Sequence, residues 1–166
     1  MSTRAIYTFG QQTEYYHVYK HWDGYPSGAL AAIEASIPFA WPLPRFEPDD
    51  FAAAFVHANR DGQCGSIYRQ IDAATHGLDR FDRAERPVTI QVHKRYPEGG
   101  GVRLMHSGEW RDVAPRDIAY RYEITARAGE LIVAAYRVAH NGARWTQTLL
   151  ATGTPQHVRD QCGEKD

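Results

Sequence analysis

The sequence predicts an α+β domain in which two helices pack on one face of an antiparallel β-sheet. Three observations predict this class. Segments rich in aromatic and β-branched residues occur near the N-terminus and throughout the second half of the chain. Two alanine-rich segments with apolar residues at helical spacing lie between them. The chain has 166 residues, enough for one domain with a substantial core.

The N-terminal residues predict a β-hairpin. Residues 3–9 (TRAIYTF) form its first strand, residues 10–13 (GQQT) its turn, and residues 14–21 (EYYHVYKH) its second strand. Side chains alternate between the two faces of a strand. One face of the second strand therefore carries Tyr15, His17, Tyr19 and His21, and the other carries Tyr16, Val18 and Lys20.

Two helices follow the hairpin. Asp23-Gly24 is a turn dipeptide, and Pro26 and Ser27 then open the first helix, because proline fits the first turn and serine can cap it. Acidic residues that complement the helix dipole begin the second helix near residue 48, after a proline-rich loop. The apolar positions of the two helices are Leu30, Ile33 and Ile37 in the first, and Phe51, Ala54, Phe55 and Ala58 in the second.

The second half of the chain predicts strands. A hairpin joins residues 87–96 and 102–106, and further strands follow at 119–124, 131–138 and 143–151. Residues 66–71 suit a short strand, and residues 72–86 suit either a loop or a short helix. We expect a single domain over residues 1–152, with an insertion at 77–116 and a flexible polar tail at 153–166.

Composition narrows the class of protein. No apolar run approaches the ~20 residues that cross a bilayer, so we expect no membrane contact. The N-terminal residues MSTRAIYTFG lack the apolar core of a signal peptide, which predicts a cytoplasmic protein. Cys64 and Cys162 match no metal or redox spacing and are expected to be free thiols.

Charge is unevenly distributed along the chain. Residues 86–145 carry 10 Lys+Arg against 6 Asp+Glu, a net charge of +4, whereas the whole chain has −1. Such a basic region suits an acidic partner, although arginines on the solvent faces of strands would give the same count. The chain has no basic helix, zinc finger or RNP motif, so we expect no sequence-specific nucleic-acid binding.

The stretch HWDGYP raises the question of a metal or catalytic site. His17, His21 and Asp23 have the composition of a metal triad, but four residues of a strand span roughly 13 Å. Two imidazoles on one ion must each lie ~2 Å from it, so an extended strand excludes a shared metal unless a bulge folds the strand. We therefore predict no metal, no cofactor and no catalytic set, with the corner serving as scaffold.

Two alternatives stay open at this corner. Unpaired N–H groups at the start of the first helix, near Gly28, lie beside Lys20 and His21 in the sequence and would suit an anion. Cys64, in the small-residue loop GQCGS, is a possible nucleophile if a histidine meets it in space. Either would make the protein a small enzyme or a nucleotide- or anion-binding module based on His17, His21 and Asp23.

TRAIYTF followed by YHVYKHWDGYPSG resembles a group of uncharacterised proteins of phages, prophages and conjugative elements. The alanine-rich segment FAAAFV (51–56) and the strand DIAYRYEI (117–124) extend the resemblance over residues 1–71 and 117–138. The resemblance implies a mobile-element accessory protein that binds stoichiometrically to a host protein or ribonucleoprotein complex. Inhibitors of host defence, such as anti-CRISPR proteins, are the best-known class.

If the chain is such a binder, the insertion is the expected contact region. Arginine and tryptophan are the residues most often found at the energetic centres of protein interfaces. The candidate partner-binding residues are therefore Arg95, Arg103, Trp110 and Arg111. Ordinary sheet surface or core would explain the same residues.

Overall fold

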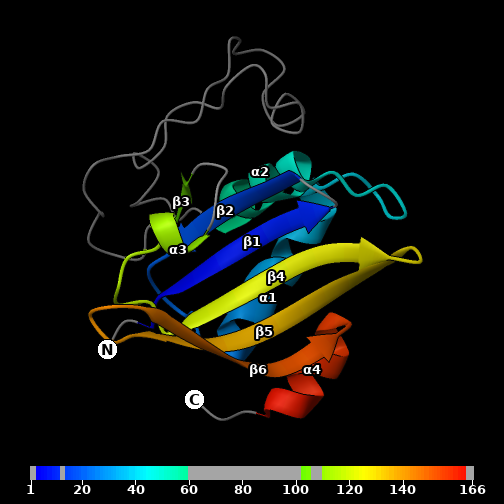
Figure 1. The fold of residues 1–166 in the computed structure, drawn as a ribbon. Coiled ribbons are helices and arrows are strands. Elements are labelled where there is room, and N and C mark those ends of the chain that lie inside the picture. Colours follow the sequence, from blue (N-terminus) through cyan, green and yellow to red (C-terminus); the bar gives the residue numbers. More distant parts are fainter. Residues whose placement is uncertain (1–2, 12–13, 60–101, 106–109, 164–166) are drawn as a thin grey trace, which may run out of the picture.

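The computed structural model describes residues 3–11, 14–59, 102–105 and 110–163 (Figure 1). In chain order the elements are β1 (Ala5–Gln11), β2 (Glu14–Lys20), α1 (Pro26–Ser36), η1 (Ile37–Phe39), α2 (Pro48–Asn59), β3 (Val102–Met105), α3 (Trp110–Val113), β4 (Tyr120–Arg127), β5 (Glu130–His140), β6 (Trp145–Gly153) and α4 (Pro155–Cys162). The predicted strands at 66–71 and 87–96, and most of the predicted insertion, lie outside the described residues.

The described strands form one six-stranded sheet in the order β3-β2-β1-β4-β5-β6. The predicted α+β class is confirmed. One pairing differs from the expected antiparallel sheet, because β1 and β4 run parallel, with Ala5 opposite Tyr120 and Phe9 opposite Ile124. Alternation and turn residues predict which neighbouring segments form hairpins. The pairing of strands from two distant hairpins is a long-range contact, and its direction leaves no local pattern in the sequence.

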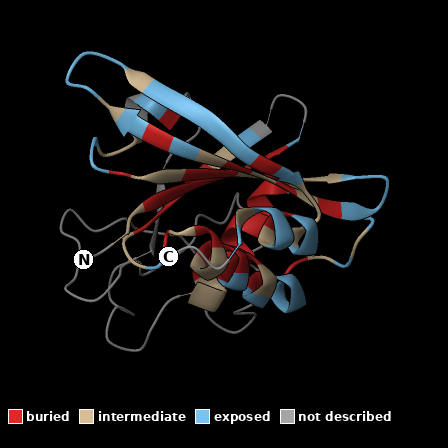
Figure 2. Ribbon diagram, turned by 90° about the horizontal axis from the view of Figure 1, so that it is seen from below, coloured by how far each residue is buried: buried red, intermediate tan, exposed pale blue. Residues whose placement is uncertain are grey.

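One face of the sheet is covered by α1, α2 and α4, which lie behind the strands in Figure 1. Aromatic residues of β1 alternate onto this face and meet α2. The ring centroids of Tyr7 and Phe55 lie 4.4 Å apart, and those of Phe9 and Phe51 lie 5.6 Å apart. The inner sides of the helices and the central strands are accordingly buried in Figure 2.

The opposite face of the sheet, which we call the open face, carries a smaller apolar cluster under the short helix α3. Its buried members are Ile6, Tyr19, Trp110, Ile118 and Val138. The strand alternation predicted for residues 15–20 is confirmed, because Tyr19 belongs to this cluster whereas Val18 lies in the core beneath the helices. Because α1, α2 and α4 cover the other face, polar side chains from several strands can meet on the open face.

The C-terminal region corrects the prediction of a flexible tail at 153–166. Residues 155–162 form α4, in which Val158 is fully buried against the core. Thr154 caps this helix, because its hydroxyl accepts a hydrogen bond from the His157 amide at 3.3 Å, and Pro155 occupies the first turn. Arg159 also donates to the Glu34 carboxylate of α1 at 2.6 Å. Thr-Pro is a helix-start signal that the polar composition concealed.

The packing of α4 predicts a measurable contribution to stability. Val158→Ala removes buried methyl groups and should lower the free energy of unfolding by about 1–2 kcal/mol. Gln156→Ala, on the exposed side of the same helix, should change it by less than ~0.5 kcal/mol. Urea denaturation of both variants checks this, and equal midpoints for Val158→Ala and the parent chain would show that α4 does not stabilise the domain.

No helix in the described part of the chain combines the length and the apolar character needed to cross a membrane.

Candidate functional site

The two N-terminal histidines have separate partners. The strand β2 is continuous through Lys20, so the backbone between His17 and His21 is extended. His17 is buried and its Nδ1 lies 3.0 Å from the Thr8 hydroxyl, whereas Nδ1 of His21 lies 2.7 Å from the Tyr19 hydroxyl. The predicted extended conformation between the two histidines is therefore present.

The start of α1 is tightly packed. A Cβ atom placed on Gly28 would lie 2.6 Å from the main-chain oxygen of Asp23, so this carbonyl closely approaches the first turn. Lys20 is buried and donates to the Trp22 carbonyl at 2.5 Å, with an Asp23 carboxylate oxygen 4.0 Å away. Burial lowers the pKa of Lys20, partly offset by Asp23.

Lys20, Asp23 and Gly28 line one shallow hollow beside α1. His21 is not part of it: its ring packs edge-on against Trp22, with 4.8 Å between the ring centroids. The structure thus does not bring the three predicted anion-binding residues Lys20, His21 and Gly28 together. Cys64 lies outside the described residues.

The predicted partner-binding residues have different environments. Trp110 is only 4% exposed, so it belongs to the open-face core rather than to the surface. Arg111 is exposed, and its guanidinium carbon lies 5.1 Å from the centre of the Trp110 ring. Arg103 lies on β3 opposite Tyr19, but its side chain is outside the described atoms, as is the whole of Arg95.

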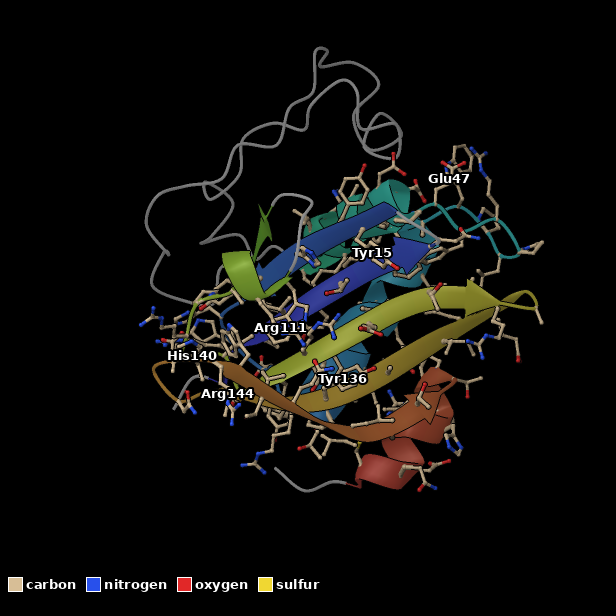
Figure 3. All side chains as sticks on the ribbon, viewed as in Figure 1. Tyr15, Glu47, Arg111, Tyr136, His140 and Arg144 are labelled. Atoms are coloured by element: carbon tan, nitrogen blue, oxygen red, sulfur yellow. The ribbon has the colours of Figure 1, made fainter. Side chains whose placement is uncertain are left out.

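Trp110 and Arg111 belong to a larger group at one end of the open face. We call it the tryptophan–arginine end and define it as Trp110, Arg111, His140, Arg144 and Trp145. The Trp145 ring lies 5.1 Å from that of Trp110 and 4.9 Å from that of His140. The Trp145 indole also donates to the Arg111 carbonyl at 3.2 Å. Figure 3 shows Arg111, His140 and Arg144 at this end of the sheet.

Beside this end, the open face is hollowed by a pocket of about 290 Å³, which we call the open-face pocket. Its wall residues come from β1, β2, α3, β4 and β6, and they are Thr8, Tyr15, His17, Trp110, Arg111, Arg121, Glu123 and Gln147. A second hollow of about 220 Å³ adjoins it and shares Thr8, Tyr15 and Glu123. Together they follow the sheet from α3 toward the β1–β2 turn.

Arg121 lines the open-face pocket and is 5% exposed. Its guanidinium carbon lies 4.9 Å from the centre of the Trp110 ring and 5.4 Å from that of Tyr136. One terminal nitrogen pairs with Glu123 at 2.5 Å, and the other donates to Gln147 at 3.5 Å. Among the described residues, none accepts a hydrogen bond from its buried Nε.

Glu123 connects Arg121 to Tyr136. The Tyr136 hydroxyl donates to the Glu123 carboxylate at 3.4 Å. Burial raises the pKa of Tyr136, and the negative charge of Glu123 raises it further, while Arg121 acts in the opposite direction. Tyr136 therefore serves as a neutral hydrogen-bond donor near neutral pH.

The chain matches no family model, no curated protein and no solved structure. The arrangement of its own residues is accordingly the basis for assigning a role. In the described ranges, no group of three or more His, Cys, Asp or Glu residues is placed to hold a metal ion.

Sequence reasoning did not single out Arg121, Glu123 or Gln147 as site residues. They lie on strands that are not neighbours along the chain, so their meeting depends on the parallel β1–β4 pairing and on the β4–β5–β6 meander. One signal was present: Arg121 lies between aromatic residues in the strand AYRYEI, where a charged side chain that alternates with Tyr120 and Tyr122 must face the open side.

Proposed function

We propose that this protein acts stoichiometrically by binding a host protein complex through the tryptophan–arginine end. The observation that carries the proposal is the joint placement of two tryptophans, a histidine and two exposed arginines on one end of the open face. Tryptophan and arginine dominate the binding energy of protein interfaces when an ordered apolar base supports them. Here the buried Trp110 supplies that base, and Trp145 and Arg111 pack against its ring.

The charge of this end indicates the kind of partner. Arg111, Arg144 and Arg116, which follows α3 in the chain, are exposed, whereas the acidic Asp117 is paired with Arg4. Complementary charge speeds encounter and selects the correct partner. We therefore infer that the partner presents an acidic protein surface.

The cellular context of the proposal comes from the resemblance carried by YHVYKHWDGYPSG. We infer that the protein is an accessory protein of a phage or another mobile element and acts in the cytoplasm of the host. Its proposed target is a defence complex, with a CRISPR surveillance complex as the first candidate. In this role it needs no cofactor and no catalytic residue.

A plasmid-interference assay in host cells, together with a pull-down by the purified chain, tests the proposal. The chain should restore transformation by a plasmid that the host CRISPR system targets, and it should co-purify with the surveillance complex. Arg111→Glu combined with Arg144→Glu should weaken that binding by roughly 100-fold, because each reversal removes an interface cation and adds a like charge.

The matched control reverses Arg45 and Arg127 to glutamate. Both side chains are exposed, and Figure 3 shows Glu47, the ion-pair partner of Arg45, far from Arg111 and Arg144. This control should keep full activity. Equal losses in both double variants would show that binding depends on the net charge of the protein and not on this surface. Binding of bare nucleic acid in place of the complex would contradict the proposal.

A further inference from the structure

The open-face pocket is a second feature that the proposed protein contact does not require. Only Trp110 and Arg111 belong to both the pocket and the tryptophan–arginine end. The remaining wall includes three buried polar side chains, because Thr8, His17 and Arg121 are 3%, 2% and 5% exposed. Polar side chains that are hidden from water need hydrogen-bond partners, so each one requires a physical explanation.

Donors exceed acceptors in this pocket. A guanidinium group carries five N–H donors. Among the described residues, Arg121 has acceptors on Glu123 and Gln147, and its Nε has none. Glu123 is the one acidic residue of the wall, against the two cations Arg121 and Arg111. Glu123 is moreover already engaged by Arg121 and Tyr136.

A buried donor without an acceptor costs free energy, which a bound acceptor would recover. The acceptors best suited to an arginine fork are the planar or tetrahedral oxyanions, because their oxygens match the spacing of the guanidinium N–H groups. The rings of Trp110 and Tyr136 both pack against this guanidinium, which restricts its orientation before any ligand arrives.

We propose that the open-face pocket binds a small ligand through a carboxylate or phosphate group, with Arg121 as the anchoring cation. The side chains of Gln147 and Thr8 lie in the same wall and supply further hydrogen-bonding groups. Arg111, at the exposed rim, adds a second positive charge. The adjoining hollow beyond Tyr15 leaves room for the rest of the ligand.

The size of the two hollows limits the ligand. Small-molecule pockets in proteins begin near ~300 Å³. The open-face pocket, at about 290 Å³, is at this lower bound, and the adjoining hollow adds about 220 Å³. Tyr15 lines both and is 46% exposed, and it lies across Gly10, where a Cβ atom would be 2.2 Å from its ring. Its ring is thus placed to cover one side of a bound molecule.

Binding to the full-length chain tests the proposal by NMR titration with three probes. Inorganic phosphate and adenosine monophosphate represent phosphoryl ligands, and citrate represents carboxylates. We expect saturable shifts at open-face residues with at least one probe below about 10 mM. Saturation by the phosphates alone or by citrate alone identifies which source of oxyanion the pocket takes.

The decisive variant is Gln147→Glu, because it adds a negative charge beside Arg121 at an exposed strand position that should not disturb folding. It should weaken the binding at least tenfold. Thr148→Glu is the matched control, since it adds the same charge one residue along β6 on the opposite face, where it should change binding less than about twofold. Tyr15→Ala, which removes one side of the pocket, should also weaken it.

Three outcomes overturn the inference: no saturable binding by any probe at 10-fold higher concentration, binding that Gln147→Glu leaves unchanged, or equal losses in the two glutamate variants. None of these bears on the proposed protein contact, because Gln147 lies outside the tryptophan–arginine end. Two further measurements separate the sites. The Arg111 and Arg144 double variant should no longer protect the targeted plasmid, whereas Arg144→Glu alone should still bind the small ligand.

Discussion

Trp110→Ala is expected to lower the free energy of unfolding by about 3–5 kcal/mol, the cost of truncating a large buried aromatic side chain. Trp110 is 4% exposed and packs with Ile6, Tyr19 and Val138 on the open face. Its ring also covers the guanidinium of Arg121 at 4.9 Å. The variant therefore opens a cavity and exposes the buried guanidinium of Arg121 to water at the same time.

This prediction separates two roles for the same residue. A surface contact residue would change partner affinity and leave the stability of the free protein nearly unchanged. Urea unfolding of the isolated chain decides between them. Arg111→Ala is the neighbouring control, since Arg111 is exposed, and it should cost less than ~0.5 kcal/mol.

A conservative variant tests whether a large loss of stability comes from the missing aromatic ring. Trp110→Phe keeps an aromatic ring in the cluster and should recover much of the stability that alanine loses, because most of the apolar contact remains. If Trp110→Ala unfolds at the same urea concentration as the parent chain, α3 does not cover the open face. Trp110 would then neither support the tryptophan–arginine end nor form part of the wall of the open-face pocket.

Most elements of the fold were predictable because their signals are local. The hairpin of β1 and β2, the helices α1 and α2, and the strands β4 to β6 all follow from alternation, helical spacing and turn residues. The parallel β1–β4 pairing was not predictable, because no local pattern records which strands of two separate hairpins become neighbours. The helix α4 was missed because its one buried residue, Val158, gives too little periodicity.

The site was predictable only in part, for the same reason. Arg111 and Trp110 were chosen by residue type, and the structure exposes the first and buries the second. Residue type shows what a side chain can bind, but burial depends on α3 folding back over the sheet. Trp145 begins β6 and Arg144 precedes it, so both are far along the chain from α3. The contact of Trp145 with Trp110 and Arg111 is therefore a long-range one.

Gly28→Ala is expected to lower the free energy of unfolding by about 1–3 kcal/mol, the cost of forcing an extra methyl group into a packed site. The added Cβ atom would lie 2.6 Å from the Asp23 carbonyl oxygen and 2.9 Å from the Asp23 Cβ. Asp23 has little room to withdraw, because its φ of 54° places it in the left-handed region at the turn before α1. Thermal or urea denaturation measures the change.

Whether Gly28→Ala lowers or raises stability distinguishes a steric clash from helix propensity. Glycine within a helix is ordinarily less stable than alanine by roughly 0.5–1 kcal/mol, so propensity alone predicts that Gly28→Ala should stabilise α1. Ala31→Gly, at an exposed position of the same helix, measures that propensity directly and should be destabilising. If both substitutions lower stability, Gly28 is required by the close approach of Asp23, and the corner HWDGYPSG is scaffold. If Gly28→Ala raises stability, the first turn of α1 has free space, and an anion site beside Lys20 becomes the better explanation of this corner.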